Sequence, residues 1–278
     1  MSVETPAPTE TQSDVLYEVD DRVATITFNR PRAYNAYTTQ TLVRLHEAFR
    51  RAMWDDAVGV VVLTGAGRSA FCTGGDVKEY ADYYVAHPEQ FRKYMVLFQD
   101  CLDAIRQMGK PTIARLNGMT VGGGNEFNMA CDLAVAADHI TIRQVGARVG
   151  SVAAGGGTQW LPIMVGDRRA REMLFLCEPI PAAQALDWGL VNRVVPFEEL
   201  DANVRELCDK LLDKFPECLS YTQCQVNYWK DQAWYATIGH AREWLAMHFA
   251  HEETAEGMRA FVEKRPPDYA AIRRGRSS

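Results

Sequence analysis

Two short glycine-rich segments hold the residues best suited to chemistry. One reads "FCTGGDVK" (71–78) and the other "VGGGNEFNMACD" (121–132). Glycine leaves the backbone uncovered, so such runs mark places where the chain approaches another group closely. Neither segment has the Lys-Ser/Thr of a phosphate-binding loop or the G-x-G-x-x-G spacing of a dinucleotide-binding loop. Taken alone, the triple glycine is equally well explained by close packing of a helix on a strand.

The two segments together indicate acyl chemistry. Each follows an apolar strand and leads into a helical stretch, and ligands of α/β sheets bind at strand ends. Two such loops facing one crevice can each offer a backbone N–H to the same oxygen, which is an oxyanion hole; each donor there stabilises a transition state by about 2.7–4 kcal/mol. Glu126 follows directly and can act as an acid or base. Alternatively, the helix dipole alone favours an acidic residue in this first turn.

Hydrophobic patterning predicts the elements that position these loops. The continuously apolar run "GVVVLTG" (59–65) is typical of a parallel strand buried on both faces. Strands alternating with helices predict an α/β class with a mostly parallel sheet, and from about residue 197 the pattern is mainly helical. We expect a disordered tail over 1–13, a core domain over 14–196 and a helical C-terminal region over 197–278. The predicted elements are a hairpin (16–19 and 23–29), helices at 39–53, 89–107 and 199–215, and strands at 59–65, 111–116 and 133–137.

Composition excludes several classes of function. The chain has 278 residues with a net charge of −6, which gives no basis for nucleic-acid binding. No apolar run reaches the roughly 18 residues of a membrane helix, so no membrane partner is expected. Seven scattered cysteines without a C-x-x-C pair predict reduced thiols in a cytoplasm. His240, His248 and His251 match no ligand motif, and Cys72 lacks a His-Asp pattern, so we expect no metal, no cofactor and no thiol nucleophile.

Six motifs, in order and spacing, identify the chain as a member of the crotonase (enoyl-CoA hydratase/isomerase) superfamily from about Leu16 to Tyr269. This resemblance implies a crotonase (ClpP-like) spiral of ββα units with a helical C-terminal trimerisation region. It also implies an acyl-CoA thioester substrate, with CoA part of the substrate, and a homo-oligomer that is a trimer or a dimer of trimers. The motifs are "FNRPRAYNA" (28–36), "AFCTGGDVKEY" (70–80), "KPTIARLNGMTVGGGNEFNMACD" (110–132), "GGGTQWLP" (155–162), "ALDWGLVNRVV" (185–195) and "EGMRAFVEKRPPDY" (256–269).

The resemblance assigns roles to individual residues. The amides of Gly75 and Gly123 fall where the family binds the thioester carbonyl and its enolate, and Glu126 matches a catalytic carboxylate. Lys78 falls where relatives contact CoA, although a solvated surface lysine explains it equally well. The 33–36 segment falls where backbone groups meet adenine or pantetheine, which makes Ala33, Asn35 and Ala36 CoA-binding candidates.

One position departs from the hydratase pattern. Hydratases carry a second glutamate, whereas here the aligned residue is Gly146, within "IRQVGARVGSVAAGGGTQWL" (142–161). The V-G-x-x-V-G-S pattern resembles dihydroxynaphthoyl-CoA synthases and alicyclic acyl-CoA ring hydrolases, in which the glycine leaves room for a cyclic acyl group and a serine, here Ser151, contacts it. Many of these enzymes also have an aspartate where this chain has Ala153. The synthases use a C-terminal tyrosine, which aligns near Phe249, so both departures argue against a synthase.

The resemblance is closest to ring-opening hydrolases of the 6-oxocyclohexenecarbonyl-CoA type, over "CTGGDVKEYADYY" (72–84) and "GSVAAGGG" (150–157). It implies an aromatic-degradation hydrolase in which a water activated by Glu126 attacks a ring ketone β to the thioester. One of Tyr80, Tyr83 and Tyr84 is expected to orient the ketone or the water, the alternative being packing, and Gln144 is expected to line the acyl pocket. The other hypotheses are an enoyl-CoA hydratase (lyase) that uses a single glutamate and a catalytically silent CoA-thioester-binding subunit.

Overall fold

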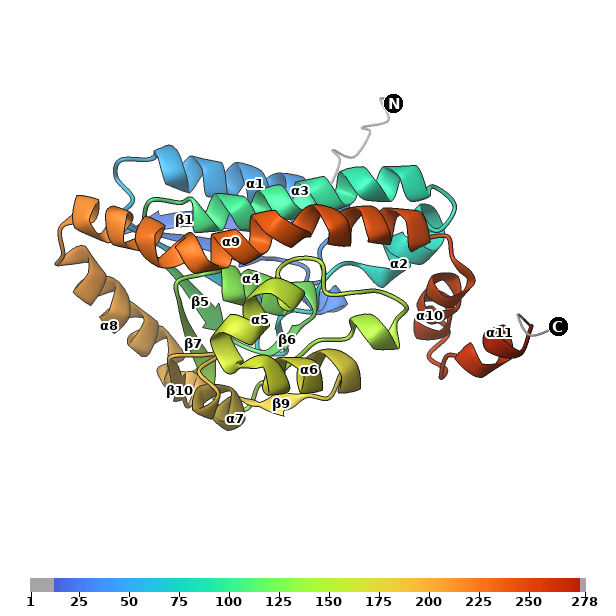
Figure 1. The fold of residues 1–278 in the computed structure, drawn as a ribbon. Helices are drawn as coiled ribbons and strands as arrows, with labels where there is room; N and C mark the ends of the chain where they lie inside the picture. The colour runs from blue at the N-terminus through green and yellow to red at the C-terminus, as the bar shows by residue number, and fades with distance from the viewer. Residues whose placement is uncertain (1–12, 276–278) are drawn as a thin grey trace, which may run out of the picture.

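The computed structural model describes residues 13–275, so the tail predicted over 1–13 lies outside the described residues except for its last position. A six-stranded sheet forms the centre (Figure 1). Its first two strands pair antiparallel as the predicted hairpin, and the other pairings are parallel. The order across the sheet is β1 (Val15–Asp20), β2 (Val23–Phe28), β3 (Val60–Gly65), β5 (Thr112–Leu116), β7 (Leu133–Ala137) and β10 (Arg193–Val195).

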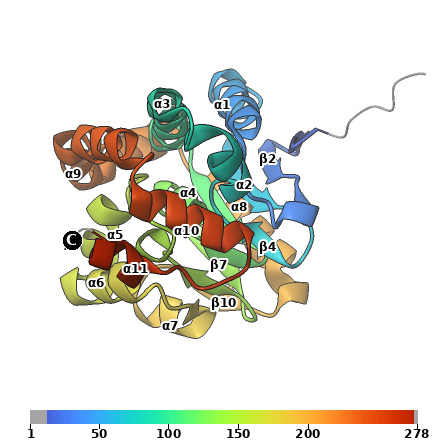
Figure 2. The same ribbon diagram turned by 90° about the vertical axis from the view of Figure 1, so that its right-hand side faces the viewer.

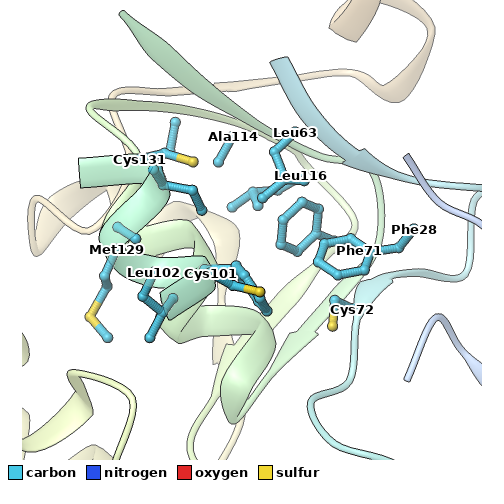
Figure 3. Packing of buried hydrophobic residues seen from close by; sticks show 14 of the residues in the cluster. Phe28, Leu63, Phe71, Cys72, Cys101, Leu102, Ala114, Leu116, Met129 and Cys131 are labelled. Carbon is cyan, nitrogen blue, oxygen red and sulfur yellow. The ribbon is translucent and has the colours of Figure 1, made fainter. Parts of the chain in front are cut away.

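The sheet is buried as its sequence predicts. All six residues of β3 are buried, which is expected for a central parallel strand covered on both faces. Figure 3 shows the apolar side chains that pack around it, among them Phe28, Leu63 and Phe71. The rings of Phe28 and Phe71 meet edge to face with centroids 5.6 Å apart, an arrangement that adds roughly 0.5–1.5 kcal/mol to the burial itself.

Three long helices lie side by side above the sheet (Figures 1 and 2). They are α1 (Thr39–Trp54), α3 (Pro88–Arg106) and α9 (Pro216–His248). Helix α1 begins where predicted because Thr38 and Thr41 form a reciprocal capping box, which satisfies amides that the first helical turn leaves without partners.

A second, smaller sheet was not predicted from the sequence. It contains β4 (Ala70–Cys72), β6 (Met119–Val121), β8 (Thr141–Arg143) and β9 (Ile180–Pro181), in that order. Strands of two or three residues are too short to show an alternating pattern. The main strands β3, β5 and β7 are each followed by one of them before the chain enters a helix, which gives the expected spiral of ββα units. Since β4, β6 and β8 pair in parallel, the loops after them lie next to one another.

The C-terminal region is helical, as predicted. Helix α9 packs on α3 and α5, and α10 returns to contact the segment after the first glycine loop (Figure 2). No helix of residues 13–275 is both long and apolar enough to cross a membrane. The other helices are α2 (Val77–Glu79) with a π-helical turn (Tyr80–Tyr84), α4 (Gly123–Ala130), α5 (Gly157–Val165), α6 (Asp167–Leu176), α7 (Ala182–Asp187), α8 (Leu200–Leu212), α10 (Glu252–Val262) and α11 (Tyr269–Gly275).

Candidate active site

The two glycine loops meet at the ends of β4 and β6. The Tyr37 amide donates to the Gly74 carbonyl, and the Asp76 amide donates to the Tyr37 carbonyl, both at 2.9 Å, so Gly75 is held between two backbone bonds. A Cβ built on Gly74 would lie 3.1 Å from the amide nitrogen of Gly123. The structure therefore brings together the two segments singled out in the sequence.

The amides of Gly75 and Gly123 are both uncommitted. Gly123 opens α4, and the first four amides of a helix have no partner within it. Neither amide donates a hydrogen bond to any residue of the described chain. A side chain at Gly75 would overlap the Tyr80 hydroxyl, and one at Gly123 would overlap the Tyr37 hydroxyl. Both positions therefore require glycine, because tyrosine hydroxyls occupy the space that a side chain would need.

A cavity of about 700 Å³ opens over these amides. Its wall comes from the two glycine loops, from α4, from the segment after β8 and from the end of α10. Of the residues predicted to form the site, the lining includes Ala33, Ala36, Gly75, Lys78, Tyr80, Gly123, Glu126, Gln144, Gly146 and Ser151.

Glu126 lies on α4, one turn after Gly123, and its side chain is buried against the cavity. Its Oε1 accepts hydrogen bonds from the amides of Gly155 (2.8 Å) and Gly157 (3.0 Å). Burial raises the pKa of Glu126 to about 7, although the two amide bonds act in the opposite direction. Its Oε2 accepts no hydrogen bond from the described residues. Glu126 can therefore hold its backbone contacts with one oxygen and exchange a proton with the other.

Asp76 is the other carboxylate in the described lining, and it is engaged elsewhere. It forms an ion pair with Arg30 at 2.9 Å and caps α2 by accepting from the Lys78 amide. Gly146 supplies no carboxylate to the cavity. Among the described lining residues, Glu126 is the one carboxylate available for acid–base chemistry.

The segment after β8 lines the cavity beside Glu126. Gln144 is buried, and its Nε2 has no hydrogen-bond partner among the described residues. A Cβ on Gly157 would lie 3.3 Å from this Nε2 and 3.1 Å from the Glu126 Oε1, so the amide and the carboxylate are neighbours. Gly146 packs closely too, since its Cβ would lie 3.0 Å from the Ser151 carbonyl oxygen.

Three predicted site residues are not among those that line the cavity. Asn35 does not line the cavity: its side chain is buried and donates to the carbonyls of Ala66 and Ala70, so it fastens the loop around it. Tyr84 directs its hydroxyl to Thr39 (2.6 Å). Tyr83 is exposed and stacks on His87. Of the three candidate tyrosines, the π-helical turn directs only Tyr80 into the cavity.

Two lining residues were missed in the sequence. Tyr37 and Tyr94 are both buried and border the cavity beside the glycines. Tyr94 has apolar neighbours at helical spacing, which is the pattern of an ordinary core position. Tyr37 stands in a loop with no periodicity. Only the folded chain shows that their hydroxyls converge on one place.

The mouth of the cavity is basic. Lys78, Arg143, Arg148 and Lys264 border it, and none of them forms an ion pair with an acidic side chain of residues 13–275. Lys78, Arg148 and Lys264 are exposed. Such cations favour a ligand with phosphate groups. No group of three or more His, Cys, Asp and Glu side chains able to hold a metal gathers in the described part of the chain.

Residues 18–272 match the family model described as enoyl-CoA hydratase/isomerase, and the chain belongs to this family, as its motifs predicted. Two curated relatives are 6-oxocyclohex-1-ene-1-carbonyl-CoA hydrolases. The one from Geobacter metallireducens is 36% identical over 91% of this chain and 80% of its own length. The one from Thauera aromatica is 35% identical over 86% of this chain and 76% of its own length.

Solved structures confirm the predicted fold. An enoyl-CoA hydratase from Mycobacterium avium subsp. paratuberculosis superposes with a TM-score of 0.83 at 26% identity, covering 92% of this chain and 98% of that chain. An enoyl-CoA hydratase from Bacillus anthracis gives a TM-score of 0.75 at 30% identity, with 92% and 99% covered.

Proposed function

We propose that this enzyme hydrolyses a C–C bond in a cyclic oxo-acyl-CoA and thereby opens the ring. The observation that carries the proposal is that Glu126 is the one available carboxylate among the described lining residues, while position 146 is a glycine. A pair of carboxylates suits the addition of water across a double bond. One base beside two uncommitted amides suits attack of water on a carbonyl. The names of the two curated relatives support the same reaction.

In the proposed complex the thioester carbonyl accepts hydrogen bonds from the amides of Gly75 and Gly123, which form the oxyanion hole. The phosphates of CoA lie against the basic mouth, where Lys78 is one contact, and Ala33 and Ala36 border the same side. The acyl ring lies toward Gly146 and Ser151. Gly146 places no side chain of its own in this part of the cavity.

The reaction consumes one water. Glu126 takes a proton from it as the water oxygen bonds to the carbon of the ring ketone. The bond between this carbon and the α-carbon then breaks, and its electron pair becomes the thioester enolate held by the two amides. Protonation of the α-carbon completes an open-chain acyl-CoA with a new carboxyl group. With a pKa of about 7, Glu126 is suited both to accept the proton and to return it.

The runner-up is an enoyl-CoA hydratase that uses Glu126 alone, which the hydratase structures of the same fold favour. The side chain of Phe249 argues against a dihydroxynaphthoyl-CoA synthase, which has a tyrosine near this position. This ring is fully buried and stacks on Phe91 with centroids 3.7 Å apart, so it offers packing where the synthase has a hydroxyl.

A substrate panel tests the proposal. The purified protein is incubated with cyclic oxo-acyl-CoAs and with linear enoyl-CoAs, mass spectrometry reports the gain of one water, and NMR reports whether a ring has opened. We expect ring opening with at least one cyclic ester. Hydration of the linear esters without turnover of any cyclic one would reject the hydrolase in favour of the hydratase.

The variant Glu126→Gln tests the base. Its amide oxygen can still accept from Gly155 and Gly157, so we expect a folded protein that binds CoA esters and has lost turnover by at least about 100-fold. Asp132→Asn is the matched control, because Asp132 is also a carboxylate with a pKa raised by burial, but it bonds to Thr112 outside the cavity. Near-normal turnover in Glu126→Gln would remove Glu126 from the mechanism.

We also propose a homo-oligomer and a cytoplasmic setting. Helix α9 exposes several large apolar side chains, an arrangement that favours contact with another copy. All seven cysteines are free thiols, five of them buried, which suits a reducing compartment.

A further inference from the structure

Three phenol groups surround the two glycine amides. The Tyr80 hydroxyl lies against Gly75, the Tyr37 hydroxyl lies against Gly123, and the Tyr94 hydroxyl also lies near Gly75. Tyr80 and Tyr94 share a hydrogen bond of 2.5 Å. The hydroxyls of Tyr94 and Tyr37 lie close enough for each phenol to influence the pKa of the other. The three hydroxyls thus form a cluster on the wall of the cavity.

Each ring is fixed by its neighbours, so the hydroxyls are preorganised. Tyr37 stacks on Phe98 (5.3 Å between centroids) and meets Phe127 edge to face. Tyr94 stacks on Phe91, and Tyr80 meets Phe249 edge to face. A donor held in this way loses little entropy when a ligand arrives.

The three hydroxyls carry more protons than they use among themselves. Three phenols carry three O–H donors, and the hydrogen bond between Tyr80 and Tyr94 uses one of them. Burial raises the pKa of both Tyr37 and Tyr94 well above the ordinary value for a phenol, so both stay neutral and keep their protons. A donor that is not used in this bond must therefore find its acceptor in the cavity that the three residues line.

From this arrangement we infer that Tyr37 binds the ketone oxygen of the substrate, with Tyr94 and Tyr80 as the positioning residues behind it. Tyr37 lies against Gly123, one helical turn before Glu126, where an attacked carbonyl must lie if Glu126 activates the water. The amides of Gly75 and Gly123 bind the thioester oxygen, and the Tyr37 hydroxyl binds the ketone oxygen. Tyr37 donates a hydrogen bond that strengthens as charge develops and transfers no proton. The inference deepens the proposed function and rests on it for the identity of the second oxygen.

The order of effects in a Tyr→Phe series tests the assignment. On a cyclic oxo-acyl-CoA we expect Tyr37→Phe to lose about 100-fold in kcat/KM, as for removal of one oxyanion donor. Tyr94→Phe is expected to lose roughly tenfold and Tyr80→Phe less, because they act only through Tyr37. Tyr84→Phe is the control, since its hydroxyl bonds to Thr39 outside the cavity. Thermal unfolding of all four variants checks that the fold is intact.

A binding measurement separates this inference from the proposed function. Calorimetry compares acetoacetyl-CoA, which carries a β-ketone, with butanoyl-CoA, which has the same length without it. We expect a preference of up to about tenfold for the ketone, lost in Tyr37→Phe and kept in Tyr84→Phe. A Tyr37→Phe enzyme that keeps the preference overturns the ketone site, even if the wild type opens rings. A Tyr37-dependent preference in a wild type that opens no ring supports the site and rejects the hydrolase.

Discussion

The pKa of Glu126 is set mainly by the burial of its side chain. In water a glutamate is almost fully ionised at neutral pH, and a weak base of that kind removes protons poorly from water. Here the apolar surroundings penalise the charge, while the amides of Gly155 and Gly157 limit the penalty. The result is a carboxylate that is close to half protonated at neutral pH, which is suited to accept a proton in one step and return it in the next.

The pH dependence of the rate follows directly. In the proposed mechanism the ionised form of Glu126 is the base, so we expect kcat/KM to fall about tenfold for each pH unit below its pKa of about 7 and to level off above it. Initial rates between pH 5 and pH 9 measure this. A profile that stays flat down to pH 5 would show that Glu126 has an ordinary pKa or that it is not the base.

At the scale of single residues, only part of the candidate site could be predicted from the sequence. The meeting of the two glycine loops was predictable because each glycine run follows an apolar strand and leads into a helical stretch. Asn35 belongs to an equally recognisable motif, yet it bonds to Ala66 and Ala70, which only the folded loop reveals. Tyr37 was not predictable, because nothing along the chain relates it to Gly123.

At the scale of elements, the short strands of the second sheet decide where the site forms. They place three loops side by side, and those loops supply Gly75, then Gly123 with Glu126, then Gln144 with Gly146. The long elements were predictable because their apolar periodicity extends over many residues. Strands of two or three residues are stabilised mainly by their partners in space, so sequence reasoning missed them and assigned the loops to the long strands instead.

Helix α10 holds the third of these loops. Thr254 donates its hydroxyl to the Gly150 carbonyl at 2.8 Å, and Gly257 packs directly on the backbone of Val149. Tyr269, at the start of α11, donates to the Arg148 carbonyl at 3.1 Å. This side of the cavity is therefore shaped by a helix more than 100 residues away in sequence.

The variant Gly257→Ala tests whether α10 holds this loop in place. Its Cβ would lie 2.5 Å from the Val149 carbonyl carbon and 2.7 Å from the Tyr269 hydroxyl, so α10 must move away. We expect Gly257→Ala to raise KM for the acyl-CoA several-fold and to lower stability by about 1–3 kcal/mol. Gly239→Ala on α9 is the control, because its new methyl would lie 4.0 Å from the guanidinium of Arg242. An unchanged KM in Gly257→Ala would show that the loop keeps its shape without α10.

At the scale of the whole molecule, the chain has an apolar surface that its own fold leaves uncovered. Helix α9 buries one side against α3 and α5, while on its other sides large apolar residues stay exposed. Trp229 and Met247, for instance, are 67% and 74% exposed. The exposed large apolar residues of α9 are Tyr221, Val226, Tyr228, Trp229, Tyr235 and Met247.

Association through α9 is the prediction at this scale. We expect light scattering on the purified protein to give three times the 31.2 kDa of one chain, or six times if two trimers pair. A charge buried at such a contact is costly, so Trp229→Glu is expected to shift the distribution toward monomer. Leu186→Glu is the control, because α7 lies at the opposite end of the molecule from α9 (Figure 1). A monomeric wild type, or a Trp229→Glu protein with unchanged mass, would exclude this face as the interface.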